Sequence, residues 1–235
     1  MGKLNMSVTR HFARVNIRDV FIMRLLNLAA LLGLLVVLGV LLWFEFAMGE
    51  MPCALFLIQR SAMFGLAVGP MMNLLWGMRP SHYGVSILAA CVGAAGSVCQ
   101  ILLHIANPDD PGHGPVVFGF HLYTWAFITF ATGIVGCAIL LLFKGQFEAG
   151  DTGVLRERGW LRLFTIAIIT WITLNLAMLG IGVLPDCGLG MCPTDPATSV
   201  GIGTVGGCLM FLAIILASFA TGAVLNRRMK SVSSQ

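Results

Sequence analysis

The chain has 235 residues, of which 58% are hydrophobic and only 10% are charged, and its mean hydropathy is +0.92. Soluble domains carry about 25% charged residues, so this composition excludes a soluble globular protein and indicates an integral membrane protein. The net charge of +4 is therefore more useful for orientation than as a sign of nucleic-acid binding, and we expect no nucleic-acid partner.

Six apolar runs follow one another along the chain, each close to the length of about 20 residues that a helix needs to cross a bilayer. They lie near residues 20–46, 61–78, 83–105, 117–143, 162–184 and 200–225. Backbone groups in lipid must be hydrogen-bonded internally, and runs this rich in Leu, Ala and Gly predict helices rather than barrel strands. The predicted fold is all-α: a polytopic transmembrane helical bundle of about six helices.

The predicted bundle divides into a four-helix core and a C-terminal helical hairpin. Residues 1–143 form the core with its basic N-terminus, residues 144–161 form a polar linker, and residues 162–235 form the hairpin with a basic tail. The basic N-terminal segment is expected to lie near anionic lipid headgroups. Glycine runs such as "CVGAAGSVC" predict small helix faces that allow close approach of neighbouring helices.

Basic residues are distributed very unevenly between the two sides of this predicted topology. Six crossings place 13 of the 14 Lys and Arg residues on one side, and Arg60 alone on the other. By the positive-inside rule, both termini are expected in the cytoplasm, and the loops near 47–60, 106–116 and 185–199 face outward.

The seven cysteines separate by their predicted depth. Cys91, Cys99, Cys137 and Cys208 fall inside apolar helices, where a thiol usually acts as a small hydrophobic side chain. By contrast, Cys53, Cys187 and Cys192 fall in outward loops, where disulfides persist. The stretch "PDCGLGMCPTDP" is compatible with a structural clip or with an exchangeable disulfide, and it lacks the histidine that would favour zinc.

The stretch "GEMPCALFLIQR" brings Cys53 close to the one outward arginine. Pro52 suits the first turn of a helix, and a helix N-terminus favours the thiolate form of Cys53. Phe56 and Arg60 are four residues apart and share a helix face, with Gln59 beside them. An arginine at this depth indicates a binding site for a polar or anionic group, although it could instead extend to the lipid headgroups.

A second polar pair ends the third apolar run. Gln100 and His104 are four residues apart and are expected to share a helix face. His104 could be a packed hydrogen-bond partner, or it could bind the carbonyls of a quinone head group together with Arg60. His121 is deeper and its role is open, whereas Tyr123 and Trp125 are expected to anchor the membrane interface.

These residues resemble the disulfide bond formation protein B (DsbB) family of bacterial quinone-dependent thiol oxidases. The family pattern Pro-Cys-x-x-Cys-x-x-Gln-Arg is similar to "PCALFLIQR", and "HGPVVFGFHLYTWAFI" also resembles its members. The resemblance implies electron flow from a periplasmic thioredoxin-fold dithiol oxidase to ubiquinone or menaquinone. It implies a redox role for Cys53, a quinone contact for Arg60 with Gln59 supporting it, and a location in the bacterial inner (plasma) membrane. Cys187 and Cys192 are assigned redox roles by their position in an outward loop. His104 is assigned to the quinone site by its depth, and Gln100 by the helix face that it shares with His104.

The sequence departs from the family pattern at one redox position. Phe56 stands where the family has its second cysteine, so Cys53 has no disulfide partner within its own loop. The loop between the third and fourth helices also lacks cysteine, and Cys187 and Cys192 lie between two additional helices. A redox-degenerate scaffold or sensor is therefore the alternative function. A transporter is less favoured because the apolar runs contain few polar residues.

Overall fold

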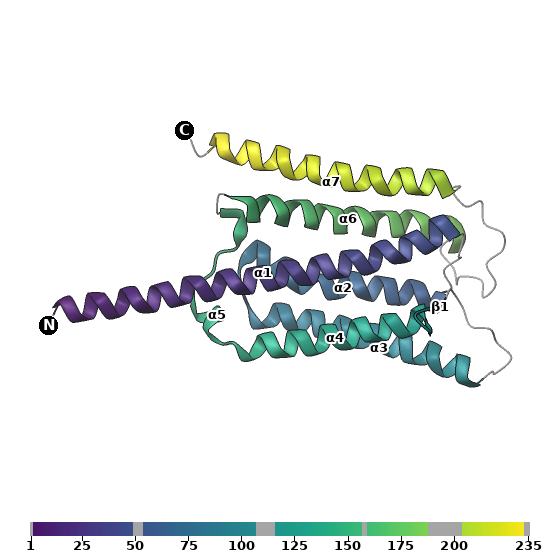
Figure 1. The fold of residues 1–235 in the computed structure, drawn as a ribbon, viewed down its shortest axis with the longest axis horizontal. Helices are drawn as coiled ribbons and strands as arrows, with labels where there is room; N and C mark the ends of the chain where they lie inside the picture. Colours follow the sequence, from purple (N-terminus) through teal and green to yellow (C-terminus); the bar gives the residue numbers. More distant parts are fainter. Residues whose placement is uncertain (1, 49–53, 107–115, 157–158, 188–203, 233–235) are drawn as a thin grey trace.

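The computed structural model describes residues 2–48, 54–106, 116–156, 159–187 and 204–232. Long helices run side by side and form a bundle, which confirms the all-α prediction (Figure 1). In chain order the elements are α1 (Gly2–Met48), α2 (Ala54–Trp76), α3 (Pro80–Ala106), β1 (Val116–Val117), β2 (Phe120–His121), α4 (Leu122–Leu142), α5 (Gly145–Glu148), the 3₁₀ helix η1 (Val154–Arg156), α6 (Trp160–Cys187) and α7 (Thr204–Val232).

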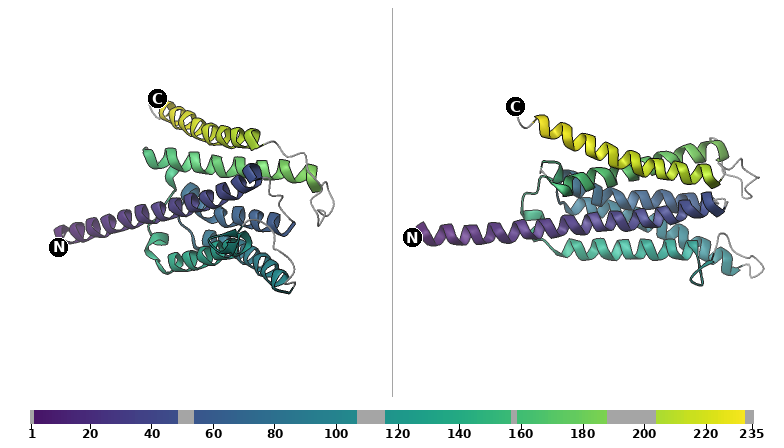
Figure 2. Two further views of the ribbon diagram at one scale, coloured as in Figure 1. Left: turned by 45° about the vertical axis from the view of Figure 1, so that its right-hand side comes forward. Right: turned by 45° about the horizontal axis from the view of Figure 1, so that its top comes forward.

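Within the described ranges, five helical segments are long and apolar enough to cross a membrane. They lie in α1, α2, α3, α4 and α6, whereas the apolar part described in α7, Leu212–Leu225, is shorter. Helix α7 nevertheless has 29 residues and packs along α6, as the turned views also show (Figure 2). The protein is therefore a polytopic membrane protein, and six crossings remain a prediction.

Several predicted boundaries need correction. Helix α1 already begins at Gly2, so the basic N-terminal segment continues the first membrane helix and projects from the bundle (Figure 1). Helix α2 begins at Ala54, in agreement with the helix start expected near Pro52, so it extends the apolar run placed near 61–78 to include Gln59 and Arg60. Helix α4 begins at Leu122 rather than at residue 117, because the preceding residues form a short hairpin.

This hairpin pairs Val116 with His121 and Val117 with Phe120 in antiparallel register. Its two-residue turn has positive φ at Phe118 (51°) and Gly119 (83°), as the twist of a tight hairpin demands. The Trp125 indole N–H donates to the Val117 carbonyl at 2.9 Å. Trp125 therefore fixes the hairpin against the first turn of α4.

The core runs through the whole bundle. Helix α3 packs between α2 and α4, and α6 with α7 packs against α1 and α2. Fully buried side chains from α1, α2, α4 and α6 include Leu31, Met63, Leu74, Phe130 and Ile168. A Cβ at Gly93 would lie 2.2 Å from the Phe130 ring, so a residue without a side chain is needed there. Within "CVGAAGSVC", this contact confirms the predicted small helix face.

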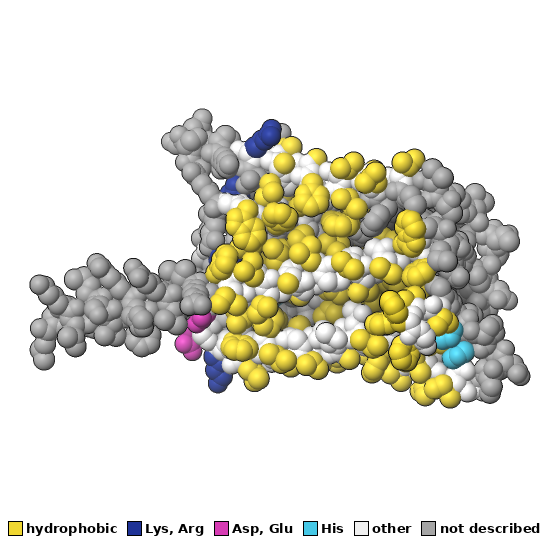
Figure 3. All heavy atoms as spheres, in the orientation of Figure 1, with side chains coloured by type: hydrophobic (Ala, Val, Ile, Leu, Met, Phe, Trp, Pro, Cys, Tyr) yellow, Lys and Arg dark blue, Asp and Glu magenta, His cyan; other side chains and the backbone are white. Residues whose placement is uncertain are grey.

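The two ends of the bundle differ in charge. The Lys and Arg side chains visible on the face drawn in Figure 3 lie at the end from which α1 projects and where α7 finishes, which we call the basic end (Figures 1 and 3). Arg79, Lys144, Arg162 and Arg227 belong to it by their positions at helix ends. Arg60 lies in the second turn of α2, near the other end, which we call the opposite end. Apolar side chains cover the surface between the ends (Figure 3).

The charge difference predicts which end faces outward. In a variant without native cysteines, a cysteine replacing exposed Phe118 should react with a membrane-impermeant maleimide in intact spheroplasts. A cysteine replacing Lys144, at the basic end, should react only after lysis. Reaction at position 144 without lysis, with protection at position 118, would reverse the predicted orientation.

Candidate functional site

Two buried polar residues lie side by side in the sequence near the start of α2. Gln59 is 1% exposed and Arg60 is 3% exposed, although both occur in a helix that otherwise carries mostly apolar side chains. Burial of an amide and a guanidinium costs free energy unless each group is hydrogen-bonded or serves a binding site. These residues therefore mark the opposite end as a candidate site.

Gln100 approaches this position from α3. The Gln59 Nε2 amide donates a hydrogen bond to Gln100 Oε1 at 2.7 Å, and Gln100 is 5% exposed. A hydrogen bond between two buried amides is strengthened by the low local dielectric. The structure thus joins two residues that the sequence analysis assigned separately to a binding site.

Phe56 lies over Arg60. The guanidinium carbon of Arg60 is 5.5 Å from the centroid of the Phe56 ring, within the range of a cation–π interaction. This contact confirms that positions 56 and 60 share one face of α2. The side chain that replaces the second cysteine of the family pattern is therefore a direct neighbour of the buried arginine.

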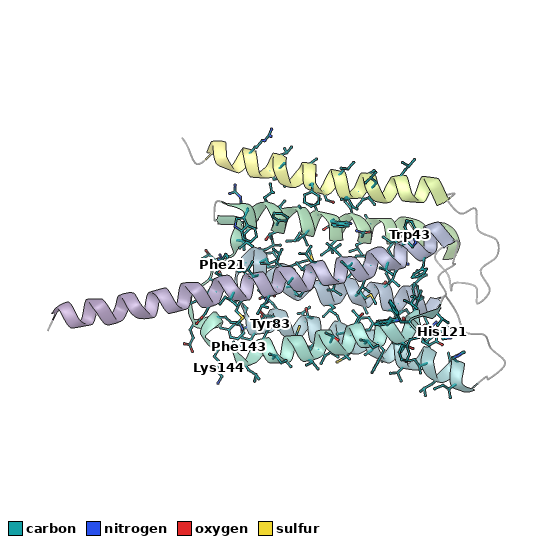
Figure 4. The ribbon with its side chains drawn as sticks, in the orientation of Figure 1. Phe21, Trp43, Tyr83, His121, Phe143 and Lys144 are labelled. Carbon is teal, nitrogen blue, oxygen red and sulfur yellow. The ribbon has the colours of Figure 1, made fainter. Side chains whose placement is uncertain are left out.

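His104 lies one turn beyond Gln100 and belongs to an aromatic cluster. Its ring centroid is 5.0 Å from that of His121 and 6.0 Å from that of Tyr123, and the His121 and Tyr123 rings stack at 5.1 Å. Figure 4 shows His121 at the opposite end of the bundle. The Nδ1 atoms of His104 and His121 are buried without a hydrogen-bond partner among the described residues.

The prediction that Tyr123 anchors the membrane interface is wrong. Tyr123 is 3% exposed, because it packs inward against the two histidines rather than toward lipid. His121 and Tyr123 are therefore members of the candidate site that the sequence analysis did not assign. The sequence places His121 and Tyr123 two residues apart, at the point where α4 begins. The direction of their rings, however, depends on the hairpin before the helix.

Only one of the three predicted redox cysteines lies within the described residues. Cys53 and Cys192 lie outside the described residues, and Cys187 is the last residue of α6, for which the structure describes the backbone. Helix α6 finishes at the opposite end (Figure 1), the end at which α2 begins and α3 finishes. Among the described cysteines, Cys137 is buried, whereas Cys91 and Cys99 are exposed on the surface of α3.

A separate polar network holds the basic end together. Asn27 donates to Tyr83 Oη at 2.9 Å, Asn73 donates to Asn27 Oδ1 at 3.1 Å, and Tyr83 donates to Gln146 at 3.1 Å. Arg24 forms an ion pair with Asp151 beside it. Sequence reasoning missed this network, although asparagines within apolar helices are a recognisable signal of buried polar contacts.

The fold and the buried amides and arginine define a polytopic helical membrane protein with a polar site at one end. Residues 23–113 match the family model for Disulfide bond formation protein DsbB. This segment, which is less than half of the chain, is similar to the DsbB family, in agreement with the resemblance noted in the sequence. Neither a curated protein nor a solved structure was found to match the chain.

The matched segment contains much, but not all, of the candidate site. Gln59, Arg60, Gln100 and His104 fall within it, on α2 and α3. His121 at the end of β2 and Tyr123 in the first turn of α4, together with Cys187 and Cys192, lie beyond it. The additional hairpin of α6 and α7 is likewise outside the matched segment.

Proposed function

We propose that the protein is a quinone-dependent thiol:disulfide oxidoreductase of a bacterial inner membrane. The observation that carries this proposal is the buried polar group of Gln59, Arg60 and Gln100 within the family segment. Such a group is costly in a membrane helix and suits recognition of a small polar head group. The family assignment supports thiol oxidation as the reaction that this site serves.

The residues present fit a quinone head group. Arg60 carries N–H donors suited to a quinone carbonyl oxygen. The Gln59 Oε1 atom is a buried acceptor without a partner among the described residues, which indicates an incomplete polar site. Arg60 would hold a ring carbonyl, Gln59 would line the site with Gln100 orienting it, and His104 would close the site from α3. The bound ubiquinone or menaquinone would supply the oxidising chemistry, accepting two electrons and two protons.

The cysteines would carry electrons toward this site. A thiolate of a reduced periplasmic thioredoxin-fold partner would attack a disulfide formed by two of Cys53, Cys187 and Cys192, giving a mixed disulfide. The second partner thiolate would then release the partner as a disulfide and leave a dithiol on this chain. Reoxidation of that dithiol by quinone gives the disulfide and quinol, so electrons and protons balance.

A second candidate function has its own observation. The Phe56 ring fills the position of the family's second cysteine and contacts Arg60 directly. A guanidinium covered by an aromatic ring suits stable binding of a ligand or partner as well as it suits electron transfer. The alternative is a redox-degenerate relative that binds quinone or a partner without turnover, as a scaffold or sensor.

The two candidates are distinguished by turnover. Purified protein in lipid nanodiscs should reduce a short-chain ubiquinone when a reduced thioredoxin-fold dithiol protein is supplied. At least two of the variants Cys53→Ser, Cys187→Ser and Cys192→Ser should each lower the rate at least about a hundredfold, since thiolate exchange needs both sulfurs of a disulfide. Cys91→Ser, on the exposed surface of α3, should keep the unaltered rate. Quinone binding without reduction would favour the scaffold or sensor.

A further inference from the structure

Only one end of the buried Gln59 amide forms a hydrogen bond within the described residues. Its Nε2 donates to Gln100 Oε1 at 2.7 Å, whereas its Oε1 atom has no hydrogen-bond partner in the part of the chain that the structure describes. The side chain is 99% buried, since its exposed fraction is 1%. A buried carbonyl oxygen left without a donor costs free energy, so this atom indicates a missing hydrogen-bond donor.

Gln100 determines which end of the Gln59 amide remains available. If the Gln59 amide alone were turned over, its oxygen would face Gln100 Oε1 at the distance now spanned by a hydrogen bond. Two carbonyl oxygens in such contact repel each other, whereas the observed orientation pairs the Gln59 N–H with the Gln100 oxygen. The contact with Gln100 therefore keeps an acceptor, rather than a donor, free on Gln59.

We propose that Gln59 Oε1 accepts a hydrogen bond from a hydroxyl group of the reduced quinol, so that the site binds quinol more tightly than quinone. This inference rests on the proposed function. The carbonyl oxygens of a quinone only accept hydrogen bonds, whereas each quinol hydroxyl can donate one. Addition of two electrons and two protons to the quinone therefore creates the donor that Gln59 lacks.

A preference for quinol has a consequence for electron transfer. By linkage, a ligand form that binds more tightly is favoured at equilibrium, so the bound couple becomes a stronger oxidant than the free couple. A tenfold ratio of the two dissociation constants raises the midpoint potential of a two-electron couple by about 30 mV. Gln59 would thus contact the ligand and favour its reduced form, the quinol. Gln100 would be a positioning residue that holds the Gln59 amide in the required orientation.

The test measures dissociation constants for a short-chain ubiquinone and for its quinol, under anaerobic conditions, with the whole protein in nanodiscs. For the unaltered protein, quinol should bind about tenfold more tightly, the effect of one hydrogen bond to a buried acceptor. Gln59→Met, which keeps the length of the side chain but has no comparable acceptor, should bring the ratio near one. Ser61→Ala should leave it unchanged, because Ser61 is exposed and bonded to its own helix at Leu57.

Gln100→Leu tests the positioning role separately. Without Gln100 Oε1, the Gln59 amide can turn and present its N–H to the ligand, so the preference should shift toward quinone. Equal affinity for the two forms in the unaltered protein, or tighter binding of quinone, would overturn the inference while leaving turnover and the proposed function intact. If neither form binds, both the proposed function and this inference are wrong. The two dissociation constants of the unaltered protein test the inference even if a variant does not fold.

Discussion

Phe56→Cys should increase quinone reduction by the protein at least about tenfold, because it places a thiol one helical turn from Arg60. The Arg60 guanidinium lies 5.5 Å from the centre of the ring that would be replaced, so the new sulfur would lie beside the cation. A neighbouring cation stabilises the thiolate, which is the form of a cysteine that attacks a disulfide. The variant would also restore the two-cysteine pattern of the family in the first loop.

Two matched variants separate the thiol from other effects of the substitution. Phe56→Ala removes the ring without adding a thiol and should give no increase. Ile58→Cys adds a thiol at an exposed position of the same helix and should also give none. An increase in either control would mean that ring removal, or any nearby thiol, is sufficient.

Adding Arg60→Leu to Phe56→Cys should reverse most of the gain. A hydrogen bond that involves a charged group is worth roughly 1.5–3 kcal/mol, which predicts a loss of quinone affinity of about ten- to a hundredfold. Rates measured against quinone concentration would show this loss. If Phe56→Cys changes nothing while the unaltered protein already reduces quinone quickly, electrons must pass through Cys53 paired with Cys187 or Cys192.

Asp151→Ala should destabilise the protein by about 3–5 kcal/mol, because it removes the carboxylate from a buried ion pair. Arg24 Nη2 contacts Asp151 Oδ1, and the two side chains are 7% and 1% exposed. Gly77 has φ +91° and lies so close to the Asp151 carbonyl that a Cβ there would clash, so the linker has little room to shift. Thermal unfolding in detergent should begin about 10 °C lower.

Arg24→Met, combined with Asp151→Ala, removes both members of the ion pair. The double variant Arg24→Met with Asp151→Ala should be more stable than Asp151→Ala alone, since replacing both members of a buried ion pair is often nearly neutral. Glu148→Ala, an exposed change in the same linker, should leave the unfolding temperature nearly unchanged. Quinone binding per folded molecule should survive all three changes, because the pair lies at the basic end. Equal unfolding temperatures for Asp151→Ala and the unaltered protein would show that the pair contributes nothing.

Local properties of the sequence predicted the class of protein and part of its site. Hydropathy and run length indicated a helical membrane bundle, because a helix in lipid needs a minimum apolar length and satisfies its own backbone. The spacing of Phe56 and Arg60 predicted their contact, since residues four apart meet on a helix whatever surrounds it. The placement of Arg60 near the opposite end followed from the order of the apolar runs.

Only the tertiary structure decided which polar groups meet across helices. The bond between Gln59 and Gln100 joins residues 41 positions apart, and the ion pair of Arg24 with Asp151 joins residues 127 apart. The inward direction of Tyr123 likewise depends on the packing of α4 against α3. Helices that are apolar on every side can rotate about their axes with little change in hydropathy, so the sequence pattern leaves their facing sides undetermined. Close packing and pairing of the buried polar groups select one rotation, and that choice assembles the site.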